Sequence, residues 1–182
     1  TAVPYYYPSE IDINGKKIHS LSGISNSLTV FCNENGYFSI NESDRYGFNN
    51  PDQDWDAKVI EYVFVGDSFT HGYCVNRPND IPSFFRQISK KAVLNLGYGR
   101  NGPLIEYATL REYMPKNTKK IIFMYYGGND LRDLNTEIKN KILYKYISDE
   151  NFNQNLINIQ KEIDTVKRKN ITIISKISKK NK

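Results

Sequence analysis

Three short polar clusters contain the side chains best suited to covalent chemistry. Gly66-Asp67-Ser68 supplies a hydroxyl, Gly127-Gly-Asn129-Asp130 supplies a side-chain amide, and Gly97-Tyr-Gly-Arg-Asn-Gly102 lies between them in the chain. Each cluster follows an apolar run that is typical of a buried strand. Because parallel strands place their carboxyl ends at one edge of a sheet, we expect the three clusters to form a single active site.

Ser68 follows a predicted buried strand, so its hydroxyl can be exposed at the edge of the sheet. Backbone N–H groups at such a turn can stabilise an oxyanion, and the amide of Asn129 donates a hydrogen bond without ionising. A serine in an isolated Gly-Asp-Ser turn more often only satisfies nearby backbone groups. Thr70 replaces the last glycine of the G-x-S-x-G elbow, which weakens an α/β-hydrolase interpretation.

Strand and helix patterns alternate from Val59 onward. Apolar runs predict strands over residues 59–65, 92–96, 120–126 and 171–177, and helical periodicity predicts helices over residues 81–90, 104–114 and 153–169. Asp80 is a suitable N-cap for the first helix, and Pro82 is tolerated in its first turn. The alternation is typical of an α/β fold in which helices cover both faces of a parallel sheet.

The first 57 residues lack long helical periodicity and are rich in turn formers. Residues 29–32 and 37–40 predict a β-hairpin around a glycine-containing turn, and residues 44–52 predict a loop. We therefore expect two parts: a β-rich N-terminal extension over residues 1–57, packed on an α/β domain over residues 58–182.

The three clusters, in this order and each after a strand, resemble the sequence blocks of the SGNH (GDSL) hydrolases. Residues 66–72 match the first block, residues 127–130 match the G-x-N-D block, and residues 95–102 match the Asn- and Gly-rich second block. The resemblance covers about residues 58–177. It implies a flavodoxin-like, three-layer α/β/α fold with a parallel sheet, and residues 44–50 add a weaker match to the region before the first block of some bacterial members.

What the resemblance implies is acyl transfer to water. Ser68 is the expected nucleophile, and its backbone N–H, an N–H of the second block and the Asn129 amide are expected to hold the oxyanion. The family's oxyanion glycine corresponds to Arg100, next to Gly99, and a positive φ costs a non-glycine residue about 1 kcal/mol. The side chain of Arg100 either contacts an acidic substrate group or points into water.

Asp67, His71 and Gly128 are expected to line the substrate site. The family's general base is a histidine in a late D-x-x-H block, which this sequence lacks, so the resemblance predicts a chain that ends before that block and is weakly active or inactive. His71 is too close in sequence to Ser68 to act as an oriented base, and we expect it to line the pocket or to lie at the surface. We interpret His19 as structural.

Two functions from different classes follow from these observations. The first is a serine-dependent esterase that acts on a small-molecule or saccharide ester or on a lipid. The alternative is a non-catalytic binding module that keeps the fold without a complete triad. A chain that continues into a D-x-x-H block would favour the first, and a natural end without one would favour the second.

Charge and composition argue against other classes. The net charge is +5, but residues 161–182 contain eight Lys/Arg and two Asp/Glu, so the rest of the chain has a net charge of −1 and no nucleic-acid partner is expected. Residues 97–102 fit a G-x-G-x-x-G dinucleotide pattern, but the next strand lacks the acidic residue that such a site uses, so we expect no cofactor.

No apolar run is long enough to span a membrane, and no leader segment opens the chain. An extracytoplasmic location is compatible with this sequence, and neither the compartment nor the oligomeric state follows from it. Cys32 and Cys74 match no metal-binding spacing, so no metal is expected. Two buried thiols are favoured over a disulfide at these positions.

Overall fold

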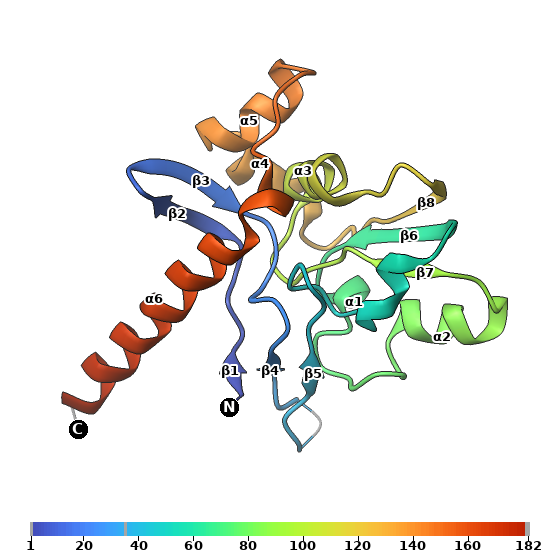
Figure 1. Cartoon of the computed structure of the whole chain (residues 1–182), viewed down its shortest axis with the longest axis horizontal. Helices are drawn as coiled ribbons and strands as arrows, with labels where there is room; N and C mark the ends of the chain where they lie inside the picture. Colours follow the sequence, from blue (N-terminus) through green and yellow to red (C-terminus); the bar gives the residue numbers. More distant parts are fainter. Residues whose placement is uncertain (1, 35, 181–182) are drawn as a thin grey trace.

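The computed structural model describes residues 2–34 and 36–180 (Figure 1). Its centre is a three-stranded parallel sheet in the order β7-β6-β8, formed by Val93–Asn95, Ile60–Gly66 and Thr118–Met124. The middle strand is almost entirely apolar and is largely buried, which is typical of a parallel sheet. The predicted α/β class with a parallel sheet is confirmed.

The register of the sheet aligns the ends of its strands. Gly66 pairs with Met124, and Phe64 pairs with Asn95. All three strands run in the same direction, so the segments that follow them begin at the same edge of the sheet. The three polar clusters of the sequence therefore lie at one edge.

Helices flank the sheet, and their bounds are α1 Ser68–His71, α2 Ile81–Ser89 and α3 Pro103–Tyr113 (Figure 1). The second and third lie within one residue of the predicted helices. The carboxylate of Asp80 accepts a hydrogen bond of 2.9 Å from the backbone N–H of Ser83, which confirms the predicted N-cap. Pro82 lies in the first helical turn, where its missing N–H leaves no broken bond.

The N-terminal segment is built from short strands, as predicted. β4 (Leu28–Val30) pairs antiparallel with β5 (Ile40–Glu42) and parallel with β1 (Val3–Pro4). The predicted hairpin is confirmed, but its second strand begins at Ile40, where the predicted strand ended. A second hairpin, β2 (Ser9–Ile13) with β3 (Lys16–Ser20), was not predicted. Its signal in the sequence is an Asn-Gly turn between alternating isoleucines, and both turn residues have a positive φ.

One hydrophobic core joins the N-terminal segment to the sheet. Ile18, Leu21 and Phe48 pack in the same buried cluster as Val63 of β6 and Leu94 of β7. Burial of apolar side chains contributes about 1.5–3 kcal/mol each, so this shared core stabilises the N-terminal segment and the sheet together.

The C-terminal part differs from the prediction. A helix over residues 153–169 and a strand over residues 171–177 were expected, but one helix, α6, runs from Gln160 to Lys180. The β-branched run at 171–177 has strand propensity, yet the described strands pair without it. Because a helix that has already formed gains one hydrogen bond per added residue, α6 continues through this run.

Several short helices were absent from the sequence interpretation. They are α4 Asp130–Glu137, α5 Lys141–Ser148 and the 3₁₀ turn η1 Asp52–Asp56, whereas the 3₁₀ turn η2 Leu156–Ile159 lies within the helix predicted over residues 153–169. The side chain of Asn140 accepts hydrogen bonds from the backbone N–H groups of Ile142 and Leu143, so this N-cap could have been recognised. None of the helices in the described residues is long and apolar enough to cross a membrane.

A buried lysine attaches α6 to the N-terminal segment. The ammonium group of Lys167 donates hydrogen bonds to the carbonyl oxygens of Ser22 and Gly23, and its side chain is fully buried. Burial lowers the pKa of Lys167 to about 7. The two carbonyl acceptors have no other donor among the hydrogen bonds of this region, so they depend on this side chain.

We expect Lys167→Ala to lower the free energy of unfolding by about 2–4 kcal/mol, because it leaves a cavity and two unpaired buried carbonyls. Lys169→Ala is the matched control on the same helix: Lys169 is exposed, and a change within about 0.5 kcal/mol is expected. Denaturant unfolding followed by circular dichroism measures both. Equal losses in the two variants would show that α6 is not held by Lys167.

Candidate functional site at the carboxyl edge of the sheet

Of the seven residues expected at the active site, all but His71 and Gly128 line one cavity of about 770 Å³. They come from three successive loops of the parallel sheet and are Asp67, Ser68, Gly99, Arg100 and Asn129. The structure therefore brings together a hydroxyl, a carboxylate, a guanidinium and an amide that lie far apart in the sequence.

Ser68 is the first residue of α1 and directly follows Asp67 at the end of β6. The side chain of Asp67 accepts a hydrogen bond of 2.9 Å from the backbone N–H of Phe69. The first N–H groups of a helix have no partner within the helix, so the N–H of Ser68 is available to a ligand. Burial raises the pKa of Asp67, and the neighbouring Asp130 and Asp133 raise it further.

Arg100 has a φ of 68°, in the left-handed region that a non-glycine residue enters at a cost. The loop is held there by neighbours: the hydroxyl of Tyr5 donates a hydrogen bond of 2.9 Å to the carbonyl oxygen of Gly99. The guanidinium carbon of Arg100 lies 3.8 Å from the centre of the Tyr7 ring, a cation–π contact. Strained loop residues that the surroundings maintain are common at functional sites.

Asn129 is oriented by the next turn of its own helix. Its side-chain nitrogen donates a hydrogen bond of 2.6 Å to a carboxylate oxygen of Asp133, and the other oxygen of Asp133 lies 3.4 Å from the Arg132 side chain. A primary amide has two N–H donors, so one donor of Asn129 remains for a ligand. Gly128 lies in the turn before Asn129, beside the ring of Tyr126.

Two acidic residues near the cavity were missed by the sequence interpretation. Glu137 accepts hydrogen bonds from the N–H groups of Gly102 and Leu104, so it caps α3 from α4. Burial, together with the nearby Asp130, raises the pKa of Glu106 to about 9, so Glu106 holds a proton at neutral pH. The i, i+4 spacing of Asn129, Asp133 and Glu137 is the signal that could have identified this helix face.

His71 does not lie where the sequence predicted. Its side chain is 1% exposed and lies in an aromatic cluster, with its ring 4.6 Å from that of Tyr98 and 4.7 Å from that of Phe31. Burial lowers the pKa of His71 to about 3, so it is neutral at physiological pH. The expectation of a pocket-lining or surface histidine was wrong, because the rings of the N-terminal segment cover this position.

His19 lines the same cavity as Ser68, although the sequence interpretation treated it as structural. It pairs across the β2–β3 hairpin with Glu10, whose carboxylate accepts a hydrogen bond of 2.7 Å from Asn140. Asn140 follows α4, whose first turn carries Asn129. Nδ1 of the His19 imidazole has no hydrogen-bond partner among the described residues, so no acid orients the ring through that nitrogen. Burial also lowers the pKa of His19 to about 4.

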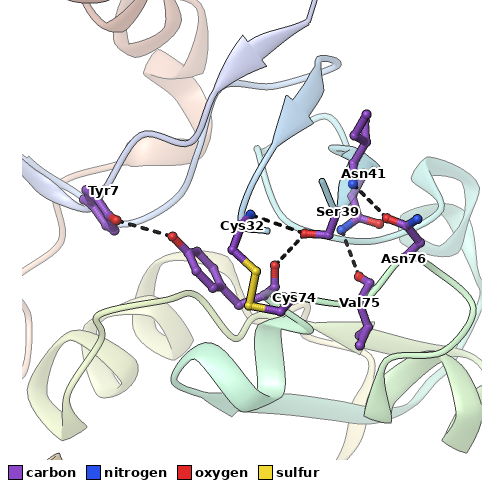
Figure 2. The surroundings of a disulfide bond; sticks show 9 residues. Tyr7, Cys32, Ser39, Asn41, Cys74, Val75 and Asn76 are labelled. Carbon is purple, nitrogen blue, oxygen red and sulfur yellow. Dashed lines mark hydrogen bonds between the residues drawn. A yellow bond between two sulfur atoms is a disulfide. The ribbon is translucent and has the colours of Figure 1, made fainter. Parts of the chain in front are cut away.

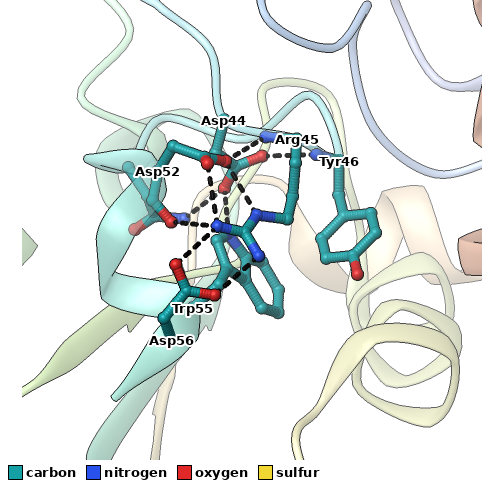
Figure 3. Close-up of polar contacts among 7 residues, drawn as sticks. Asp44, Arg45, Tyr46, Asp52, Trp55 and Asp56 are labelled. Atoms are coloured by element: carbon teal, nitrogen blue, oxygen red, sulfur yellow. Dashed lines mark hydrogen bonds and ion pairs between the residues drawn. The ribbon is translucent and has the colours of Figure 1, made fainter.

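A buried carboxylate organises the loop that packs behind the cavity. Asp44 accepts hydrogen bonds of 2.9 Å from the N–H group of Tyr46 and of 2.7 Å from the side chain of Trp55 (Figure 3). It also accepts hydrogen bonds of 2.9 Å from the N–H group of Phe48 and of 2.8 Å from the side chain of Asn50. Burial raises the pKa of Asp44 to about 6, and these four donors oppose that effect by stabilising the charged form.

An ion-pair group closes the same loop on its outer side. Arg45 bonds to the carboxylates of Asp52 and Asp56, each at 2.8 Å (Figure 3). These partners raise the pKa of Arg45 and lower those of both carboxyls. The three side chains are partly or largely exposed, so this group adds little stability and mainly defines the shape of the loop.

Cys32 and Cys74 form a disulfide, with their Cα atoms 5.4 Å apart (Figure 2). The sequence favoured two buried thiols, and that expectation was wrong: the β4–β5 hairpin crosses over the segment that follows α1. Glu34 lies close to both sulfur atoms, but sulfurs bonded to each other are not thiolate ligands. The hydroxyl of Ser39 donates a hydrogen bond to the carbonyl oxygen of Tyr73 beside the disulfide, and Ile40 and Asn41 donate further hydrogen bonds to the same segment.

The burial of His71 predicts acid sensitivity. The pKa is 6.5 in the unfolded chain and about 3 in the fold, so between pH 6.5 and 3 the unfolded state binds more protons and stability falls as the pH falls. The contribution reaches about 1.4 kcal/mol per pH unit.

His71→Phe keeps a ring in the aromatic cluster and removes the titrating group. As the pH is lowered from 6 to 4, we expect the free energy of unfolding of this variant to decline less steeply than that of the wild type. Denaturant titrations over this pH range measure both. Because both proteins share all other titrating groups, the difference in slope isolates His71. Parallel slopes would show that His71 is protonated at an ordinary pKa in the fold.

Comparison of the chain with protein-family models, with curated proteins and with solved structures found no match. The chemistry of the cavity is therefore inferred from its residues and their arrangement alone.

Proposed function

We propose that this protein is a serine-dependent ester hydrolase of the SGNH (GDSL) type, with a flavodoxin-like three-layer domain. One observation carries the proposal: Ser68, Arg100 and Asn129 line a single cavity at the carboxyl edge of a parallel sheet. The proposed substrate is a small-molecule or saccharide ester or a lipid, and the reaction requires no cofactor.

In the proposed reaction the hydroxyl oxygen of Ser68 attacks the ester carbonyl carbon and loses its proton to a base. The carbonyl oxygen becomes an oxyanion, which accepts hydrogen bonds from the N–H groups of Ser68 and Arg100 and from the Asn129 amide. Collapse of the intermediate releases the alcohol, which takes up a proton, and leaves an acyl group on Ser68. Water then releases the acid and restores the serine hydroxyl.

The positive φ of Arg100 supports the assignment of its backbone to the oxyanion site. The second block of the resemblance has a glycine here, and this chain adopts the glycine-like conformation with an arginine. A backbone N–H donates equally well from either residue. Fixed donors of this kind are worth about 3 kcal/mol each to the transition state.

A non-catalytic binding module is the second candidate, and a specific observation favours it. A serine needs a base to become a strong nucleophile, and an oriented imidazole usually has that role. In the described part of the chain, His71 is buried among aromatic rings, and burial lowers the pKa of His19 to about 4, which makes its imidazole a weak base. Neither supports rapid deprotonation of Ser68.

The esterase and the binding module differ in the expected hydrolysis of 4-nitrophenyl acetate by this protein. The esterase proposal predicts slow, Ser68-dependent hydrolysis, about a thousandfold above water, because an oxyanion site acts without an oriented base. Added imidazole should accelerate it by supplying the missing base. Ser68→Ala, measured under identical conditions, corrects for hydrolysis by imidazole itself. Identical rates for wild type and Ser68→Ala, together with no acyl adduct by mass spectrometry, would support the binding module.

We expect Asn129→Ala to lower kcat about a hundredfold with little change in KM, since the lost donor acts mainly in the transition state. Asn151→Ala, at an exposed position away from the cavity, is the control and should leave both constants unchanged. Initial rates over a range of ester concentrations separate the two constants. A change confined to KM would assign Asn129 to ground-state binding, and a lower melting temperature would make it structural.

A further inference from the structure

One wall of the cavity is formed by Tyr7, Tyr73 and Arg100. The two phenol oxygens lie 3.3 Å apart and share a hydrogen bond, beside the disulfide (Figure 2). The backbone N–H of Tyr73 donates to the carbonyl oxygen of Ser68 at 3.1 Å. This wall is therefore attached directly to the turn that carries the proposed nucleophile.

Arg100 brings a positive charge to this wall. Among the described residues no carboxylate lies within ion-pair distance of its guanidinium, whereas Arg132, the other arginine at the cavity, pairs with Asp133. The Tyr7 ring supports the guanidinium from one face and leaves its N–H groups without an anionic partner. A guanidinium held in this way matches the two oxygens of a carboxylate or phosphate.

The phenol pair adds a neutral donor to the same wall. Burial and the hydrogen bond to Tyr7 together raise the pKa of Tyr73 to about 12, so the phenol is protonated at physiological pH. In a hydrogen bond between two hydroxyl groups only one hydrogen is used. The second remains free to donate to a bound group.

We infer that this wall binds an anionic oxygen group, a carboxylate or phosphate, that is part of the substrate. The inference rests on the proposed function and makes it more specific: the ester carbonyl lies at Ser68 while the anion contacts the guanidinium of Arg100 and a phenol hydroxyl of the Tyr7–Tyr73 pair. Glu34 also lines the cavity and raises the pKa of Tyr73, so its charge opposes the anion and limits the affinity.

Binding is tested on the Ser68→Ala protein, which cannot be acylated at this position. Monomethyl succinate and methyl phosphate are the anionic probes, and dimethyl succinate is the neutral analogue. We expect the anions to bind about three- to tenfold more tightly than the neutral ester, as measured by NMR titration, and the difference to shrink at high salt.

Matched variants assign the binding to one side chain. Arg100→Asn removes the cation and keeps a residue that tolerates positive φ, so it should abolish the anion preference. Both arginines are exposed, but the Arg132 guanidinium is paired with Asp133, so Arg132→Gln is the control at the same cavity and should keep the anion preference. Glu34→Gln should increase the preference for the anionic probes, because it removes the opposing negative charge. Equal binding of anionic and neutral probes, or a preference that survives Arg100→Asn, would overturn the inference.

Kinetics then show which side of the ester carries the anion. Mono(4-nitrophenyl) adipate carries a carboxylate on the acyl side, and its methyl ester is the neutral analogue. The substrate 4-acetoxybenzoate carries the carboxylate on the leaving group, and its methyl ester is again the neutral analogue. We expect kcat/KM to favour the anion in one pair, with the ratio lost in Arg100→Asn. If hydrolysis depends on Ser68 but neither pair of substrates shows a preference for the anion, the anion site is rejected and the esterase proposal stands. Arg100-dependent binding without Ser68-dependent hydrolysis would keep the anion site and reject the esterase.

Discussion

A reciprocal pair of buried asparagines holds the carboxyl edge of the parallel sheet together. The side chain of Asn50 accepts from the backbone N–H of Asn95 at 2.8 Å and donates to its carbonyl oxygen at 2.9 Å. Both residues are almost fully buried, and Asp44 accepts a further hydrogen bond from Asn50. If the N-terminal loop and strand β7 separated without exposure to water, each would keep unpaired polar groups. An unpaired buried polar group costs about 1–3 kcal/mol, so the two segments stabilise each other.

The same network extends to the loops around the cavity. The side chain of Asn95 donates to the carbonyl oxygen of Thr70 in α1 and accepts from the backbone N–H of Gly97, both at 2.9 Å. A Cβ atom at Gly97 would meet the Thr70 side chain at 2.5 Å, so the close approach of these two loops requires glycine. One asparagine therefore couples the serine-bearing helix to the arginine-bearing loop, and the N-terminal segment completes the site.

The third loop is held by charge and hydrogen bonds along α4. Asp133 orients the Asn129 amide, and one turn later the carboxylate of Glu137 caps the N-terminus of α3 through the N–H of Gly102. Carboxylates near a helix N-terminus are favoured by the exposed N–H groups and the helix dipole. The face of α4 that lines the cavity thus connects the proposed oxyanion donor to the helix that follows the arginine loop.

Local signals in the sequence were sufficient to predict the α/β class with a parallel sheet and the Asp80 cap. They also placed the three polar clusters at one edge of the sheet. Each of these features depends on periodicity and on residues a few positions apart. Only the tertiary structure decided that His71 is buried, that Cys32 and Cys74 meet, and that residues 171–177 extend a helix instead of forming a strand. These outcomes depend on which distant segment covers a position or pairs with it. Propensity is a local property of the chain, whereas burial and strand pairing are properties of the packed molecule.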